Sequence, residues 1–363
     1  MKTIKQHMLL LLVIALAIGF SSCSKSGTAK SNKSTVTVST FAGSGTMGSA
    51  NGTGTAASFL YPSGIVSSGN GALYIGDFGN NLIRTINISS AAVNIVAGTG
   101  TAGLINGSVT AAEFNGPANI ALDASGDLFI SDEENNVIRE ITSAGNVSTV
   151  AGAGIAGYQD GAAGTAEFNF PEGIVVDANG DLYVADGHNS VIRKITMSTG
   201  MVSTYAGIAG TTGFANGAAS SATFNEPYGL ALDNSGNLYV TDILNNSIRK
   251  ITVSTNTVST YAGTGTKGFS NGTAATATFY YPLGCVLDSQ GNLYVSDTYN
   301  NVIRKVSTSG NVTTFAGTGA QGSADGDAAS ATFNFPIGIS VYGNAVFVAD
   351  THNNVIRKIT IGQ

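Results

Sequence analysis

The stretch LYVADGHNSVIRKI, residues 182–195, places three residues that could do chemistry close together. Asp186, His188 and Arg193 are the types that build a general base oriented by a carboxylate, and Asp and His also bind metal ions. A catalytic interpretation requires that such a group occurs in one place only. The rest of the chain therefore has to be compared with this stretch before the three residues are given a role.

The stretch occurs six times, with a spacing of 53 to 56 residues. The shared carboxylates are Asp77, Asp132, Asp186, Asp242, Asp297 and Asp350, and seven residues after each comes Arg84, Arg139, Arg193, Arg249, Arg304 or Arg357. A single site does not need six copies, so we interpret these residues as structural. The Asp is predicted to accept backbone N–H bonds in the following D-x-x-N-N loop. The Arg is predicted to bridge carboxylate and carbonyl groups between strands or blades.

Each repeat reads as four short strands. In the third copy, residues 173–186 hold two alternating apolar runs around a turn, residues 190–196 a third run and residues 201–207 a fourth. Four antiparallel strands per repeat are typical of a propeller blade. The sequence therefore predicts an all-β, six-bladed β-propeller. A lone strand at 34–43 and a final third strand at 354–362 indicate that the N-terminal strand completes the last blade, which removes exposed edges.

Composition agrees with this fold and excludes one class of partner. The chain has 363 residues, with 48 glycines and only 10% charged residues, which favours strands joined by many tight turns. The formal net charge is −6. Nucleic-acid binders normally carry the opposite charge, so no nucleic-acid partner is expected.

The first 23 residues have the pattern of a secretory leader: a lysine-bearing start, an apolar run from Met8 to Phe20, small residues and Cys23. The run is about 13 residues long, short of the roughly 20 that span a bilayer. The sequence FSSC resembles the lipobox of bacterial lipoproteins. That resemblance implies a signal peptide at 1–22, a lipidated Cys23, a polar tether at 23–33 and a propeller at 34–363. An ordinary leader cleaved nearby is the alternative.

Three motifs recur with small departures over nearly all of residues 34–363: P-x-G-[IL], D-x-x-G-[ND]-L-[YF]-[VI]-x-D-x-x-N-[NS]-x-I-R-K-[IV], and [FVY]-A-G. In these motifs the chain resembles the NHL-repeat six-bladed propellers. The resemblance implies the fold. It leaves the function open, because propellers of this kind are used as binding platforms, sensor domains and occasionally enzymes.

Function is expected where the six copies differ, namely beside each blade proline and in the two residues after the shared Asp. In a propeller these loops open on one face, so both sets are predicted to ring one mouth of the central channel, the default ligand site. The candidate ligand-binding residues are Tyr61, Glu172, His188, Glu226, Tyr228, Tyr281, Tyr299 and His352. This aromatic and mildly acidic rim favours a protein, peptide or glycan. His188 and His352 fall in opposite blades, too far apart to share a metal ion.

Enzyme patterns were compared with the same positions. The peptidyl-hydroxyglycine lyase that resembles this family has zinc-binding histidines directly after the blade prolines. In this chain those positions hold no histidine; they are Ser63, Ala118, Glu172, Tyr228, Leu283 and Ile337. Six-bladed lactonases bind a metal ion in the channel with a set of Glu and Asn or Asp residues. Of such a set, only Glu172, Glu226 and Asn119 could be present here. Cys285 replaces an Ile or Leu of the other copies and is interpreted as a core residue. The DGD sequence at 325–327 could suggest calcium, but one carboxylate pair does not define a site.

The sequence therefore predicts a non-catalytic, monomeric propeller with no cofactor and no metal, held in the bacterial cell envelope only through the lipid on Cys23. Its predicted partner is a protein, peptide or glycan of the envelope, bound at the channel mouth. The alternative is a metal-dependent hydrolase or lyase with its site in the central channel, centred on Glu172 and Glu226. A purely structural spacer remains a third possibility.

Overall fold

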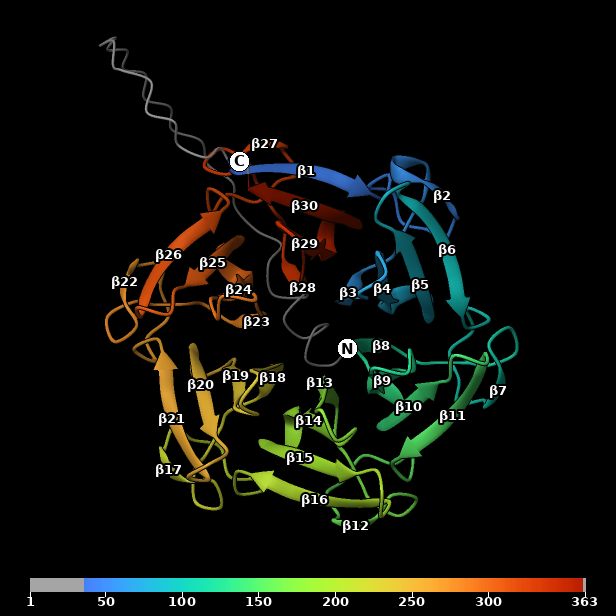
Figure 1. The fold of residues 1–363 in the computed structure, drawn as a ribbon, viewed down its shortest axis with the longest axis vertical. Helices are drawn as coiled ribbons and strands as arrows, with labels where there is room; N and C mark the ends of the chain where they lie inside the picture. Colours follow the sequence, from blue (N-terminus) through green and yellow to red (C-terminus); the bar gives the residue numbers. More distant parts are fainter. Residues whose placement is uncertain (1–35, 362–363) are drawn as a thin grey trace, which may run out of the picture.

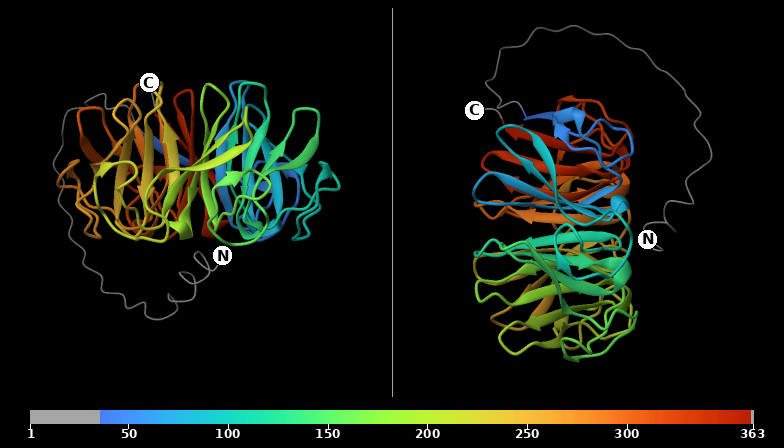
Figure 2. Two further views of the ribbon diagram at one scale, coloured as in Figure 1. Left: turned by 90° about the horizontal axis from the view of Figure 1, so that it is seen from below. Right: turned by 90° about the vertical axis from the view of Figure 1, so that its right-hand side faces the viewer.

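The computed structural model describes residues 36–361, so the predicted signal peptide, Cys23 and the tether lie outside the described residues. Figure 1 shows six antiparallel sheets arranged radially around one axis. The predicted all-β, six-bladed propeller is confirmed. Figure 2 shows the resulting disc edge-on, with loops on both flat faces. Among the described residues, no helix has the length and apolar character needed to cross a membrane.

Each blade runs from an inner strand at the axis to a short outer strand. The inner strands are β3 (Pro62–Ser67), β8 (Pro117–Leu122), β13 (Pro171–Val176), β18 (Pro227–Leu232), β23 (Pro282–Leu287) and β28 (Pro336–Tyr342). The second strands are β4 (Ala72–Asp77), β9 (Leu128–Asp132), β14 (Leu182–Asp186), β19 (Leu238–Asp242), β24 (Leu293–Asp297) and β29 (Ala345–Asp350). We number the blades 1 to 6 in this order.

The outer part of each blade completes the sheet. The third strands are β5 (Leu82–Asn87), β10 (Val137–Ile141), β15 (Val191–Thr196), β20 (Ser247–Thr252), β25 (Val302–Val306) and β30 (Val355–Ile361). The fourth strands are β6 (Ala92–Ala97), β11 (Asn146–Ala151), β16 (Met201–Ala206), β21 (Thr257–Ala262), β26 (Asn311–Ala316) and, in blade 6, β1 (Val36–Ala42). The sequence predicted these four strands per blade.

A fifth strand, which the sequence did not predict, lies at the outer edge of every blade. These strands are β2 (Gly52–Thr53), β7 (Gly107–Ser108), β12 (Gly161–Ala162), β17 (Gly217–Ala218), β22 (Gly272–Thr273) and β27 (Gly326–Asp327). Each pairs antiparallel with a fourth strand. Two residues are too few to show an alternating pattern, which explains why they escaped the sequence comparison.

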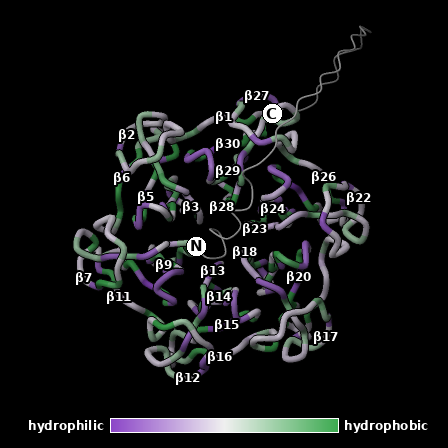
Figure 3. The backbone as a smooth tube through the Cα atoms, turned by 180° about the vertical axis from the view of Figure 1, so that it is seen from behind, coloured by the Kyte–Doolittle hydropathy of each residue, from purple (hydrophilic) through white to green (hydrophobic). Residues whose placement is uncertain are grey.

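The N-terminal strand closes the ring as predicted. Strand β1 pairs antiparallel with β30, with Val36 opposite Ile361 and Ser39 opposite Lys358. Apolar side chains then pack between neighbouring blades: Ile65 and Ile75 of blade 1 share one buried cluster with Phe347 and Ile356 of blade 6. Hydrophobic segments therefore recur in every blade (Figure 3). The core is a set of interfaces between blades, one after another around the axis.

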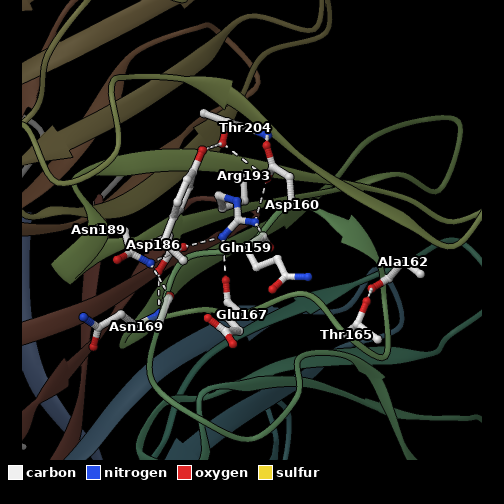
Figure 4. Close-up of polar contacts among 12 residues, drawn as sticks. Gln159, Asp160, Ala162, Thr165, Glu167, Asn169, Asp186, Asn189, Arg193 and Thr204 are labelled. Carbon is white, nitrogen blue, oxygen red and sulfur yellow. Dashed lines mark hydrogen bonds and ion pairs between the residues drawn. The ribbon is translucent and has the colours of Figure 1, made fainter.

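The repeated Asp and Arg hold each blade to its long loop (Figure 4). In blade 3, the Asp186 carboxylate accepts hydrogen bonds from Arg193 Nη1 at 2.7 Å and from Asn189 Nδ2 at 2.9 Å. Arg193 is fully buried, stacks over the Phe168 ring and donates to Asp160 at 2.7 Å. The same arrangement recurs in all six blades; the acid–base pairs are Asp77–Arg84, Asp132–Arg139, Asp186–Arg193, Asp242–Arg249, Asp297–Arg304 and Asp350–Arg357.

One detail of this network differs from the expectation. The backbone N–H that the Asp accepts belongs to the segment before the inner strand, as in Asn169 N–H to Asp186 Oδ1 at 2.8 Å, and not to the D-x-x-N-N loop. The Asp therefore ties three separate segments of the chain together. Burial raises the pKa of Asp186 to about 6 although Arg193 opposes the rise. These residues form the framework that positions the variable loops.

Candidate functional site

The blade prolines and the ends of the second strands lie at one face of the disc, because each proline pairs with the framework Asp, as Pro171 does with Asp186. We call this the mouth face. A 3-10 turn follows the Asp in five blades, for example η4 (Gly187–Asn189), and these turns lie beside the residues that flank the prolines. The two variable sets therefore meet on one face, as predicted.

The residues directly after the prolines do not line an open rim. They are Ser63, Ala118, Glu172, Tyr228, Leu283 and Ile337, and each is at most 5% exposed. The Tyr228 hydroxyl of blade 4 lies 3.4 Å from Ser63 Oγ of blade 1, which is the opposite blade. We call these six residues the channel plug. Their side chains fill the channel at this level, which corrects the expectation that all the residues beside the prolines form the rim.

Below the plug, towards the other face, the inner strands surround a cavity of about 270 Å³. Its walls come from all six blades and include Ile120, Ile174, Cys285 and Ile339. Cys285 is buried, and burial raises the pKa of its thiol to about 12. A thiol protonated at neutral pH is a poor nucleophile, which agrees with its interpretation as a core residue.

Above the plug, the rim carries a continuous series of ring contacts through blades 5, 6 and 1. Tyr281 lies 4.6 Å from Tyr299, and Tyr299 lies 5.0 Å from Phe335. Phe335 stacks on His352 with centroids 4.4 Å apart, and His352 meets Tyr61 edge-on at 6.0 Å. We call these five residues the aromatic arc. Tyr280 extends it outwards, at 5.1 Å from Tyr299.

Blades 2, 3 and 4 contribute carboxylates to the same face. Glu133 and Glu172 are both buried, and burial is the largest cause that raises the pKa of each. Burial raises the pKa of Glu172 well above its ordinary value, and the charges of Glu133 and then Glu226 add to the rise. We call Glu133, Glu172 and Glu226 the acidic set.

Left-handed backbone at the residue before each proline helps to direct the rim side chains. The φ angles are 51° at Tyr61, 66° at Gly116, 56° at Phe170, 54° at Glu226, 50° at Tyr281 and 59° at Phe335. In five blades an Asn of the preceding blade accepts the backbone N–H of this residue, as Asn354 does for Tyr61 at 2.9 Å. The other four such bonds are Asn81 to Gly116, Asn136 to Phe170, Asn246 to Tyr281 and Asn301 to Phe335.

The structure divides the eight candidate residues into groups. Tyr61, Tyr281, Tyr299 and His352 lie together in the aromatic arc, and Glu226 lies half-buried on the rim. Glu172 and Tyr228 lie in the channel plug. His188 lies apart from the arc, against Phe170 of its own blade at 4.4 Å.

Three contributing residues were not among the candidates. Phe335 links Tyr299 to His352, the charge of Glu133 raises the pKa of Glu172, and Tyr280 extends the arc. Phe335 and Glu133 occupy variable positions that the sequence comparison assigned to the rim, but they were not selected as candidate ligand-binding residues. Tyr280 directly follows the repeated Phe, a position not recognised as part of the face. Within residues 36–361, no three His, Cys, Asp or Glu side chains are grouped so that they could hold a metal ion.

Comparison with known proteins gives a family motif in blade 3. Residues 168–195 match the NHL repeat. The matched segment contains the Asp186 and Arg193 network, so the framework described above is an NHL-repeat framework in this blade. Taken with the six sheets, the match supports an NHL-repeat six-bladed propeller.

Two curated relatives show similar sequence over most of this chain. It is 29% identical over 312 residues to Protein SUPPRESSOR OF QUENCHING 1, chloroplastic, from Arabidopsis thaliana. It is 28% identical over 327 residues to NHL repeat-containing protein 2 from Bos taurus. The matches cover 81% and 80% of this chain but 30% and 45% of those proteins, so the chain spans less than half the length of either.

Among solved structures, an auxiliary nutrient binding protein from Bacteroides thetaiotaomicron superposes with a TM-score of 0.69. The identity is 19%, and the superposition covers 91% of this chain and 78% of that chain. At this identity the likeness shows a shared fold.

Proposed function

We propose that this protein is a non-catalytic binding propeller of the bacterial cell envelope, anchored by a lipid on Cys23, that captures a peptide, protein or glycan at its mouth face. The observation that carries the proposal is the aromatic arc. It joins residues of three blades into one surface, and its rings are held by their neighbours and by the blade framework.

Pre-organised aromatic side chains suit recognition. Tyr and His offer a broad apolar face together with a polar group, and they lose little conformational freedom when a ligand is bound. Tyr61, Tyr281, Tyr299 and His352 are all partly exposed, so their faces and edges are available. The framework beneath them keeps their spacing fixed, because it is anchored by buried ion pairs such as Arg304 with Asp297.

The non-catalytic part of the proposal rests on how the reactive groups are distributed. The framework carboxylates are bound to arginines, Cys285 is a protonated thiol in the channel wall, and His352 is stacked flat on Phe335. Burial lowers the pKa of His352 and of His188. The fold likeness to an auxiliary nutrient binding protein agrees with a binding role.

The test uses a double variant of the arc, Tyr281→Asn with Tyr299→Ala. Asn is chosen at 281 because the φ of 50° there is left-handed, which Asn tolerates. Binding of a panel of soluble glycans and peptides to the full chain is measured by calorimetry. We expect at least one ligand to bind and the double variant to weaken it at least about tenfold, the scale of lost hot-spot contacts.

The matched control is Tyr158→Ala, which removes an exposed aromatic residue from an outer loop. It should leave the affinity unchanged. If the panel contains no ligand, or if the ligand binds the double variant as well as the wild type, the mouth face is not the binding surface. The anchor is tested separately with Cys23→Ser, which should move the protein from the membrane fraction to the soluble fraction.

A further inference from the structure

We infer that the cavity below the channel plug is a second binding site, which takes a neutral, polyhydroxylated ligand of the size of a monosaccharide. The plug separates this cavity from the aromatic arc, so the site does not depend on the proposed function. Four features of the cavity support it: its size, the backbone edges in its wall, the side chain of Asn119 and the charges at its opening.

The cavity has a closed end and an open end. The buried side chains of the channel plug close it towards the mouth face. Its wall continues to Leu122, Val176 and Leu232, which are the last residues of β8, β13 and β18 and are partly exposed. The cavity therefore opens at the opposite face of the disc. Its volume of about 270 Å³ lies just below the range of about 300–1,000 Å³ that is typical of small-molecule pockets, so one sugar ring fits and a peptide does not.

Backbone groups without a sheet partner line this cavity. Each inner strand is hydrogen bonded to a neighbouring strand on one side only, so its other edge faces the axis (Figure 1). Along such an edge every second residue points its N–H and C=O groups away from the sheet. Two contacts between blades 1 and 6 follow this pattern: Ser67 N–H donates to Ser340 Oγ at 3.0 Å, and Ser67 Oγ donates to the Val341 carbonyl oxygen at 2.8 Å. The remaining edge groups require partners from water or from a ligand.

Asn119 adds a side-chain donor to the wall in blade 2. The other five blades have a glycine at this position, as at Gly173 in blade 3. Asn119 lines the cavity, and its Oδ1 accepts the Ile120 N–H at 2.8 Å. The amide oxygen is thereby occupied, while Nδ2 donates to no acceptor within residues 36–361. Asn119 therefore offers a ligand a donor that the glycine of a sister blade cannot offer.

The wall of the cavity favours a neutral ligand with several hydroxyl groups. Among the described residues the wall contains no charged side chain, so burying an ion there is costly. A purely apolar ligand would leave the backbone edges without hydrogen-bond partners. A hydroxyl group both donates and accepts, which matches edges that carry N–H and C=O groups side by side. Ile120, Ile174 and Ile339 supply aliphatic surface for the C–H groups of a sugar ring.

Carboxylates surround the open end on four blades. The residues that directly follow the last residue of an inner strand there are Asp123, Asp177, Asp233 and Asp288. Their positions are fixed by the turns: Asp177 Oδ1 accepts N–H bonds from Asn179 at 2.8 Å and from Asp181 at 3.0 Å. Asp233 is paired with Lys250 at 3.8 Å. The other three carboxylates keep the opening negative, which disfavours anionic sugars such as uronates.

The experiment titrates the full chain by calorimetry with D-glucose, D-galactose and D-mannose and with the uronate of each, at about pH 7 and low salt. We expect at least one neutral hexose to bind with a dissociation constant of about 1 mM or less, the scale for a ligand of this size. Its uronate should bind at least about tenfold more weakly, because the wall offers its charge no partner. Asn119→Gly should weaken the hexose about tenfold, through the loss of one buried donor.

Asn119→Gly introduces the residue that the other five blades have, so the fold is expected to persist, and circular dichroism checks it. Asn179→Ser is the matched control. It removes an exposed amide from a turn at the same face and introduces the Ser that blades 2 and 4 have at this position, Ser125 and Ser235. The hexose affinity should stay unchanged in this variant.

Three results would overturn the cavity site: no hexose binds, the uronate binds as tightly as its hexose, or Asn119→Gly binds as tightly as the wild type. The Tyr281→Asn, Tyr299→Ala variant separates the two proposals, because it should bind the hexose with unchanged affinity. Loss of hexose binding in that variant would assign the sugar to the mouth face, which overturns the cavity site and leaves the proposed function standing. Failure of the mouth-face titrations alone would leave the cavity site standing.

Discussion

The two halves of the mouth face are built on the same framework but are joined differently. In blades 5, 6 and 1 the rim is aromatic, and neighbouring blades are tied by two kinds of side-chain bond. Thr298 and Thr351 donate to the carbonyl oxygens of Pro336 and Pro62 at 2.7 and 2.8 Å, in addition to the Asn bonds. In blades 2, 3 and 4 the rim carries the carboxylates, and Glu133, Gly187 and Ile243 stand where blades 5 and 6 have these Thr residues. Blade 4 is tied to blade 5 by Thr241 instead, which donates to the Leu283 carbonyl oxygen at 2.6 Å.

Blade 3 departs furthest from its sisters. Ser190 stands where the other five blades have the Asn that reaches into the next blade, and Ser has no side-chain amide. On its other side, Asn119 replaces the glycine that follows the proline by two residues, and it forms an additional pair with Ser131. In blade 3 itself that glycine is Gly173, where a Cβ would collide with the Tyr228 carbonyl. The comparison teaches that the Asn tie is missing at one place only, between blades 3 and 4, while Asn136 and Asn246 still join the other blades of the acidic half.

The largest expected effect concerns the buried Asp–Arg framework, which both halves of the mouth face share. Arg193→Leu in blade 3 and Arg357→Leu in blade 6 should each lower the free energy of unfolding by about 3–5 kcal/mol, because each leaves a buried carboxylate without its partner. Urea unfolding measures both. Lys194→Leu, which breaks a partly exposed pair, should cost less than about 1 kcal/mol. A large loss in one blade only would refute a shared framework.

The next effect compares the ties between blades. Asn354→Ala removes the acceptor of the Tyr61 N–H and should cost about 1–3 kcal/mol. Ser190→Ala at the equivalent position should cost under about 0.5 kcal/mol, in the range of ordinary substitutions. Both positions have left-handed φ angles, 54° and 57°, so the backbone cost of Ala is matched. Equal losses by thermal and urea unfolding would contradict the difference between the halves.

A pH dependence distinguishes the acidic half. The pKa of Glu172 in the folded protein lies above its ordinary value, so the folded state holds a proton that the unfolded state releases. Its contribution is fully present below about pH 4.5 and decreases as pH rises, by up to about 1.4 kcal/mol per pH unit. Glu172→Gln should flatten unfolding free energy measured from about pH 5 to about pH 8. An unchanged slope would exclude this protonation.

Two controls accompany that measurement. Glu134→Gln removes a carboxylate from the same turn of the mouth face at a partly exposed position and should leave the slope close to that of the wild type. The framework aspartates, whose pKa values burial raises to about 6, contribute equally in every variant. The contribution of Glu172 is therefore the difference in the pH slope of unfolding free energy between the wild type and Glu172→Gln.

The smallest expected effect comes from restoring the Asn hydrogen bond that is missing between blades 3 and 4. Ser190→Asn places an amide where the other blades have one, within reach of the Glu226 backbone if the geometry follows its sisters, and Asn tolerates the φ of 57°. We expect a gain of about 0.5–1.5 kcal/mol, the net value of one hydrogen bond. Thermal unfolding measures the shift. Destabilisation would show that this contact between blades 3 and 4 is shaped differently from the others.

The fold was predictable because its determinants are repeated. Each blade supplies the same Pro, Phe, Asp and Arg, so a comparison of the chain with itself identifies the unit and assigns Asp186 and Arg193 to the framework. The sequence could not show which backbone N–H the Asp carboxylate accepts. Its N–H donor, Asn169, lies seventeen residues away in sequence, and only tertiary structure brings them together.

The site was predictable in its location and less in its detail. The comparison located the variable positions, but it could not say which of them point outwards. Tyr281 and Tyr228 flank equivalent prolines, yet Tyr281 reaches the rim from a left-handed residue while Tyr228 enters the plug. That difference follows from backbone angles and from the close approach of neighbouring blades, which residue types alone do not reveal. Whether the candidate residues bind a ligand stays a prediction.

Strand β1 has a consequence for how the protein is made. It finds its partner β30 only after all six blades have been synthesised, so the ring cannot close before the last described strand is present. Until then blade 6 lacks its fourth strand and the neighbouring edges stay unpaired. Closure of the disc is thereby a late event in folding, because its first and last strands must meet across the full length of the propeller.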